Sequence, residues 1–122
     1  MKKYILIVIF ILALLGIVGW AWLYIQSRII INNLPQQTVN PDGYTAQDVA
    51  LHATREDCWM IVHDKVYNIT PFVSVHPGGS IIASGCGKDS TSMFEDRPNN
   101  EGAHSQRART ILQKLYIGEL KS

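Results

Sequence analysis

An uninterrupted apolar run near the N-terminus constrains this chain more than any other feature. Residues 4–25 (YILIVIFILALLGIVGWAWLYI) contain no charged side chain. As an α-helix, these 22 residues would extend about 33 Å, enough to cross a bilayer core of about 30 Å. Trp20, Trp22 and Tyr24 gather at the far end of the run, where aromatic rings favour the membrane interface. We therefore expect one transmembrane anchor over residues 1–25.

A cleaved signal peptide is the main alternative for this segment. Lys2 and Lys3 would suit its basic start, but the apolar run is longer than the usual stretch of about 7–15 residues. Only residues 19–21 offer a small-residue cleavage pattern near the end of the run, and the tryptophan between the two small residues makes that pattern poor. An uncleaved anchor is the favoured interpretation.

The charges that flank the run predict its orientation. Lys2 and Lys3 precede the span, and only Arg28 follows it before residue 45. Basic residues near a span tend to stay in the cytoplasm, so we expect a cytoplasmic N-terminus. The rest of the chain would then be extracytoplasmic: periplasmic or on the cell surface in a bacterium, or luminal in a eukaryote.

Composition excludes several classes of protein. The formal net charge is +1 and no basic patch or tail occurs, which argues against nucleic-acid binding. Two cysteines are too few for a disulfide framework or a four-cysteine zinc site. No second apolar run is long enough to span a membrane, which excludes a polytopic transporter.

The remaining chain divides into a linker and one small domain. Residues 26–43 are rich in Asn, Gln, Pro and Gly and read as a linker, although Ile29–Ile31 would either extend the anchor or lie at the interface. Residues 44–122 would form an α+β domain with a small mixed sheet and short helices. Its expected elements are a helix over 46–52 with a capping box at Thr45 and Asp48, strands over 58–62 and 66–69, a short helix from Pro71, short helices within 76–94, a helix over 104–115, and a final turn or strand over 116–120.

Two of the four histidines have informative neighbours. Pro77 holds the backbone of His76 outside the helical region, and the glycines after it, Gly78 first, allow a flat group to approach the backbone. His104 precedes Ala108 by one helical turn, so it would lie on the apolar face of the last helix and point inward. Two imidazoles facing one apolar cavity suit an iron porphyrin. Apolar packing on that group would come from Phe72, Ile81, Ile82, Phe94 and Leu112.

Other interpretations of these histidines remain open on the residues alone. A histidine on a helix face is more often a core residue that bonds a backbone carbonyl. A zinc site is disfavoured, because the pair lacks an obvious third and fourth ligand. His63 lies in a turn signal and His52 precedes the hairpin, so both fit a ligand role less well.

A series of motifs runs in order through residues 44–120. They are Trp59 before an apolar strand, Val66-Tyr67-Asn68-Ile69-Thr70, Phe72, His76-Pro77-Gly78-Gly79, the segment from Cys86 to Phe94, His104-Ser105, and Tyr116-Ile117-Gly118-Glu119-Leu120. Together they resemble the cytochrome b5 haem-binding domain. The resemblance implies non-covalent haem b (iron protoporphyrin IX), with His76 and His104 as axial ligands and with Pro77, Gly78 and Ser105 among the contacts.

This chain departs from the family pattern in one place. More residues separate Phe94 from His104 than the family usually has, and Asp96 to Gly102 looks like an insertion. Loops tolerate such additions at small cost, so we keep His104 as the second ligand. The charges of residues 95–101 are interpreted as a solvated loop rather than a docking site.

The two cysteines allow three interpretations. We favour two separate buried thiols at Cys58 and Cys86. A disulfide is the second interpretation, if the domain faces an oxidising compartment. Covalent attachment of haem is the third and is disfavoured, because no C-x-x-C-H motif occurs.

The function expected from these features is a membrane-tethered carrier of single electrons. Two histidine ligands would leave no open position for a small-molecule substrate, and no Gly-x-Gly-x-x-Gly motif occurs, so we expect no enzyme activity. A reductase and an acceptor would be separate proteins. The alternative is a module for haem sensing, storage or delivery at the membrane. A third hypothesis, an interaction module that has lost haem, is disfavoured by the intact histidine pair.

Overall fold

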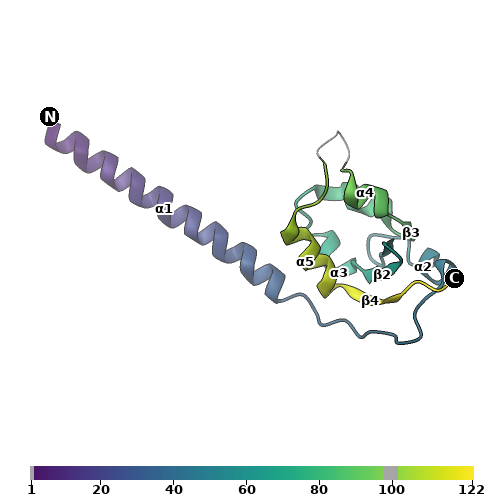
Figure 1. Ribbon diagram of the computed structural model, residues 1–122. Helices are drawn as coiled ribbons and strands as arrows, with labels where there is room; N and C mark the ends of the chain where they lie inside the picture. The colour runs from purple at the N-terminus through teal and green to yellow at the C-terminus, as the bar shows by residue number, and fades with distance from the viewer. Residues whose placement is uncertain (1, 98–101) are drawn as a thin grey trace. The chain divides into compact units, whose positions relative to one another are not determined.

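The computed structural model describes residues 2–97 and 102–122 (Figure 1). Its contacts divide the chain into two compact units, one that ends at Asn33 and one that runs from Leu34 to Ser122. The first unit contains helix α1 (Lys2–Asn32), and the second contains a four-stranded sheet with short helices. The second unit has the α+β composition and the mixed sheet that the sequence predicts.

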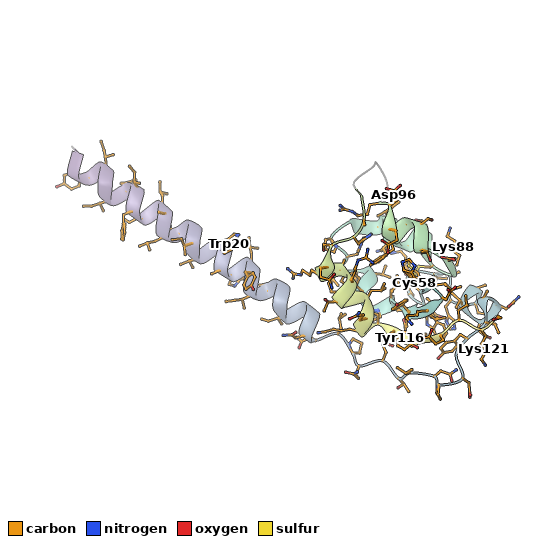
Figure 2. All side chains as sticks on the ribbon, in the orientation of Figure 1. Trp20, Cys58, Lys88, Asp96, Tyr116 and Lys121 are labelled. Carbon is orange, nitrogen blue, oxygen red and sulfur yellow. A yellow bond between two sulfur atoms is a disulfide. The ribbon has the colours of Figure 1, made fainter. Side chains whose placement is uncertain are left out.

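Helix α1 is continuous, and its described side chains between Tyr4 and Ile25 are all exposed. Residues Ile7–Gln26 are long and apolar enough to cross a membrane, judged by length and composition. Trp20, labelled in Figure 2, stacks on Tyr24 one turn later, with ring centres 6.1 Å apart. The helix continues through residues 26–32. The sequence allowed Ile29–Ile31 either to extend the anchor or to lie at the interface, and in the structure they extend the helix. A helix that is apolar on every side needs an apolar environment around it.

The sheet is organised around one tight hairpin. Strand β1 (Trp59–Val62) pairs antiparallel with β2 (Lys65–Asn68), and only His63 and Asp64 lie between them. Both turn residues have positive φ, 49° and 59°. Two positive φ angles give the turn whose twist matches that of the paired strands. The predicted hairpin is therefore confirmed.

Two further strands complete the sheet in the order β3-β1-β2-β4. Strand β4 (Tyr116–Glu119) pairs antiparallel with β2, and Figure 1 shows this last strand in yellow leading to the C-terminus. Strand β3 (Lys88–Asp89) pairs parallel with β1. The sequence did not predict β3, because two residues carry no recognisable alternation.

Helix α2 (Ala46–Ala50) begins at the predicted capping box. The Thr45 backbone N–H donates to Asp48 Oδ2 at 2.8 Å, and the Asp48 N–H donates to Thr45 Oγ1 at 3.2 Å. Val49 on this helix is fully buried and packs in one cluster with Ile61, Val66 and Ile117. This apolar cluster fixes the sheet to the helix.

The other helices are short, as the glycine-rich sequence predicts. They are α3 (Thr70–Val73), the 3-10 helix η1 (Gly79–Gly85), α4 (Thr91–Glu95) and α5 (Gln106–Lys114). Helix α5 begins later than expected, because Ser105 is its N-cap and accepts a hydrogen bond from the Ala108 N–H at 3.3 Å. The expected insertion over 96–102 includes residues 98–101, which lie outside the described residues.

The expectation of two separate thiols is wrong, because Cys58 and Cys86 form a disulfide. Figure 2 labels Cys58, which is fully buried, and the Cα atoms of the pair lie 4.9 Å apart. The parallel pairing of Met60 with Lys88 explains the contact. Cys58 lies two residues before Met60 and Cys86 lies two residues before Lys88, so the same register brings the cysteines together. The unpredicted strand β3 therefore also accounts for the bond, which was the second of the three interpretations of the cysteines.

We expect reduction of this disulfide to destabilise the domain. The bond joins residues separated by 28 positions, and closing a loop of that size contributes about 3–4 kcal/mol to the free energy of unfolding. Urea unfolding of the full chain in detergent, with and without dithiothreitol, measures the difference. The double variant Cys58→Ala/Cys86→Ala is the control and should not respond to the reductant. Two thiols reactive in the denatured, unreduced protein would contradict the bond.

Candidate functional site

One cavity of about 810 Å³ lies within the second unit. This volume falls in the range of about 300–1,000 Å³ that is usual for sites of small molecules and cofactors. Apolar side chains from β1, α3, η1, α4 and α5 make up most of its wall. All ten residues that the sequence singled out line it: Phe72, His76, Pro77, Gly78, Ile81, Ile82, Phe94, His104, Ser105 and Leu112.

His76 lies between α3 and η1 and is half-buried. Its Nδ1 lies 3.2 Å from the Gly79 carbonyl oxygen, so Nδ1–H donates there in the neutral ring and Nε2 remains the acceptor. A Cβ at Gly78 would stand only 2.7 Å from Cε1 of the same ring. Gly79 in turn has a φ of +71°, which glycine adopts without strain. The first glycine therefore makes room for the histidine ring, a more local role than the one proposed from the sequence.

The electrostatic surroundings of His76 favour the neutral imidazole. Burial lowers the pKa of His76 below its ordinary value, and nearby His104 lowers the pKa further, while the hydrogen bond to Gly79 opposes the shift. Neutral imidazole is the form that binds metals, because its second nitrogen keeps a lone pair. Phe72 contacts the ring edge-on, with centres 5.7 Å apart.

His104 also lines the cavity, but its position has a different cause from the one predicted. The residue precedes the N-cap of α5 and is not helical, so its spacing from Ala108 does not set its direction. Its backbone N–H and its Nδ1 both bond the Phe94 carbonyl oxygen, at 3.1 and 2.8 Å. The imidazole also stacks on the Phe94 ring, with centres 4.7 Å apart and planes 4° apart. Helix α4 therefore orients this histidine.

The two imidazoles face each other with ring centres 6.4 Å apart. A first-row metal ion bonds imidazole nitrogen at about 2.0–2.1 Å, and each ring centre lies about 1 Å behind that nitrogen, so a linear arrangement needs about 6 Å. Both Nδ1 atoms are taken by backbone carbonyls, which leaves both Nε2 atoms for the ion. Among the described residues no third His, Cys, Asp or Glu joins the pair to complete a zinc site. The geometry fits two axial ligands of a flat iron porphyrin.

The other two histidines do not line the cavity. The His52 ring stacks on Trp59 at 3.6 Å, and its Nδ1 bonds Asp57 at 2.8 Å. His63 lies in the hairpin turn, and its Nε2 bonds Glu95 at 2.7 Å. Both have structural partners of their own.

A charged cluster behind Phe94 was missed in the sequence. Arg109 bonds both carboxylate oxygens of Glu95, at 2.9 and 2.6 Å, and its guanidinium lies 5.3 Å from the centre of the Phe94 ring. His63 completes the cluster through the same carboxylate. The partners come from β1–β2, α4 and α5, so no local spacing reveals them. The cluster holds in place the ring on which His104 stacks.

Two lining arginines were missed as well. Arg97 and Arg107 both contribute to the cavity wall. The first lies within residues 95–101, which the sequence indicated as a solvated loop, and its contribution to the wall became visible only in the folded domain.

Comparison with known proteins identifies relatives of this second unit. A family model described as the cytochrome b5-like haem/steroid binding domain matches residues 45–121. Cytochrome b5 of Candida tropicalis is 46% identical over 79 residues, which cover 64% of this chain and 57% of that protein. Cytochrome b5 of Brassica oleracea var. botrytis is 44% identical over 77 residues, which cover 62% of this chain and 54% of that protein. The chain thus spans little more than half the length of these relatives.

Solved structures show the same fold. Cytochrome b558 of Ectothiorhodospira vacuolata, described as a prokaryotic homologue of cytochrome b5, is 41% identical and superposes with a TM-score of 0.61. The match covers 63% of this chain and 95% of that one. Cytochrome b5 of Ostreococcus tauri virus 2 is 32% identical, with a TM-score of 0.58, and the match covers 69% of this chain and 90% of that one.

We expect the cluster around Glu95 to contribute to stability in a pH-dependent way. The hydrogen bonds from Arg109 first, and from His63 second, lower the pKa of Glu95 from 4.5 to about 2. Because the pKa is lower in the folded state, the stabilisation is complete above pH 4.5 and is lost as the pH falls from 4.5 toward 2. The loss of melting temperature between pH 7 and pH 3 should therefore be smaller in Glu95→Gln than in the wild type.

The exposed Glu56 provides the matched control. Glu56→Gln removes a carboxylate outside the cluster and should retain the acid sensitivity of the wild type. Equal acid sensitivity in Glu95→Gln and Glu56→Gln would contradict a special role of the cluster.

Proposed function

This chain belongs to the cytochrome b5 family, and we propose from that membership that it is a membrane-tethered cytochrome that carries single electrons on haem b. Proteins of this family bind haem b non-covalently. The observation that carries the proposal is the opposed pair of His76 and His104, 6.4 Å apart across an apolar cavity. Two nitrogen ligands on opposite walls suit a flat macrocycle that holds a metal ion. A steroid holds no metal ion for these nitrogens to bind.

Each part of the cavity wall has a separate task in this proposal. His76 and His104 would be the axial ligands, and the bonds from their Nδ1 atoms to Gly79 and Phe94 would hold the rings in the coordinating tautomer. Ile82, Phe72 and Leu112 would exclude water from the faces of the macrocycle. Bound haem would supply a reversible one-electron couple, whose potential depends on ligand type, hydrogen bonding and burial.

The same arrangement favours a carrier over an enzyme. When both axial positions are filled by side chains, a substrate has no free position on the metal. The chain also lacks the glycine motif of a nicotinamide or flavin site. The electrons would therefore come from a separate reductase and pass to a separate acceptor protein.

Two independent features support an extracytoplasmic haem domain anchored by α1. Lys2 and Lys3 before the span outnumber Arg28 after it, which favours a cytoplasmic N-terminus. The buried disulfide between Cys58 and Cys86 is the second feature, because structural disulfides persist in oxidising compartments. The anchor would hold the cytochrome at the membrane, where electrons are exchanged with membrane-bound partners.

We expect the purified full chain in detergent to have the absorption spectrum of a low-spin, six-coordinate b-type haem in both redox states. Substitution of either ligand, His76→Ala or His104→Ala, should remove that spectrum, and added imidazole should restore it by filling the vacated space. His63→Ala is the control and should keep the wild-type spectrum. Acidified organic solvent should extract the haem, because no covalent attachment motif is present.

Two results would contradict this assignment. An unchanged low-spin spectrum in His104→Ala would mean that another group is the second ligand. Rapid transfer of haem from the wild type to apomyoglobin, together with failure of reversible reduction, would instead favour the delivery module.

We expect the orientation of helix α1 in the membrane to reverse when the basic residues that flank it are exchanged between its two ends. The wild type is expressed in a bacterium, thiol exchange is stopped with acid, and free thiols are labelled after denaturation. The wild type should show no free thiols, because its cysteines form the disulfide. The variant Lys2→Gln/Lys3→Gln/Gln36→Arg/Gln37→Arg reverses the charge bias and should place the domain in the cytoplasm with both thiols reduced. Protease added to spheroplasts should reach the domain of the wild type only. A wild-type domain that is protected until the membrane is opened would overturn the proposed orientation.

A further inference from the structure

The charges on the cavity wall are of one sign. Apart from the two imidazoles, the charged groups among the described lining residues are Arg97 and Arg107, and no aspartate or glutamate lines the cavity in the part of the chain that the structure describes. The rest of the wall is apolar or uncharged, and Ile81 and Pro77 are among its exposed apolar members. A ligand suited to this wall is flat and apolar over most of its area and carries negative charge on one side.

Both arginines lie on the wall that also carries His104. Arg97 follows α4, and its backbone N–H and its Nε both donate to the Gly102 carbonyl oxygen, at 3.1 and 3.0 Å. These two bonds tie Arg97 to the residue before Ala103, which also lines the cavity. Arg107 lies in the first turn of α5, two residues after the N-cap. Arg97 is thus tied to the chain two residues before His104, and Arg107 lies three residues after it.

We propose that Arg97 and Arg107 form a carboxylate clamp for the two propionate groups of haem. The inference rests on the proposed function and assigns residues to a part of the ligand that the axial histidines do not touch. A guanidinium presents five N–H donors in a planar fork that matches a carboxylate, so the bond from Nε to Gly102 is compatible with a further contact. The positive end of α5 adds to the attraction, and Ser105, the N-cap of this helix, also lines the cavity.

One of the two clamp residues lies in a segment by which this chain differs from the usual family pattern. Arg97 belongs to the segment Asp96–Gly102, by which the sequence departs from the usual family spacing between Phe94 and His104. Arg97, at the start of this segment, would thus add a second cation to the wall of the site. The clamp also distinguishes haem from a neutral steroid, which has no charge to place against two arginines.

The experiment compares haemin with haemin dimethyl ester, in which both carboxylates are uncharged. The full chain in detergent is stripped of haem, and each ligand is titrated into the wild type, Arg97→Gln, Arg107→Gln and the double variant. Each single substitution should weaken haemin binding about two- to fivefold, as expected for exposed charged pairs, and should leave the affinity for the ester unchanged. The double variant should bind haemin and the ester equally well. At about 1 M salt, where the Debye length is about 3 Å, the wild-type preference for haemin should shrink.

Arg55→Gln is the matched control, because Arg55 is exposed and lies outside the cavity wall. It should keep the wild-type preference for haemin over the ester. Equal losses for both ligands in Arg97→Gln and Arg107→Gln would overturn the clamp and assign the arginines to the fold of the wall. An unchanged haemin affinity in the double variant would also overturn it. Failure of the proposed function is distinguishable, because the wild type would then give no low-spin spectrum with haemin.

Discussion

The site depends on two hydrogen bonds from histidine Nδ1 to main-chain carbonyl oxygens. Each bond selects the tautomer and the direction of one imidazole, and together they leave two Nε2 atoms on facing walls of the cavity. A carbonyl can do this only if the backbone around it is fixed. The carbonyl of Gly79 is fixed by a turn that glycine permits, and that of Phe94 by helix α4 and the Glu95–Arg109 pair. The short helices therefore serve to position backbone oxygens.

The disulfide links this arrangement to the sheet. Cys58 leads into β1, which supplies Met60 and Val62 to the cavity wall, and Cys86 ends the 3-10 helix that follows His76. The bond therefore ties the wall that carries one histidine to the central strand. Seven residues of 3-10 helix have weaker hydrogen-bond geometry than an α-helix and hold their position less well alone. A covalent bond at the end of η1 compensates for that weakness.

The sequence predicted those features whose signals are local. The capping box at Thr45 and the hairpin follow from neighbours a few positions apart. The family resemblance supplied the ligand roles of His76 and His104 and part of the list of pocket-lining residues. Features that depend on contacts between distant segments were either not predicted from the sequence or not favoured. The disulfide follows from a two-residue parallel strand, and the pair of Glu95 with Arg109 joins residues 14 positions apart. The late start of α5 was missed because the bonds from His104 to Phe94 outweigh helix propensity at that position.

Position relative to the cavity separates the arginines near the site into two kinds. Arg109 lies over the Phe94 ring, but both its terminal nitrogens bond Glu95, so an opposite charge lies within about 3 Å. The field of such a pair falls off much faster with distance than that of a single cation, so Arg109 acts on the site by holding Phe94 in place. Arg97 and Arg107 differ from Arg109 in position, because they line the cavity itself. In the proposed cytochrome these two cations would lie beside the haem itself, so their charge would act on the iron directly when the charge of the iron changes by one unit.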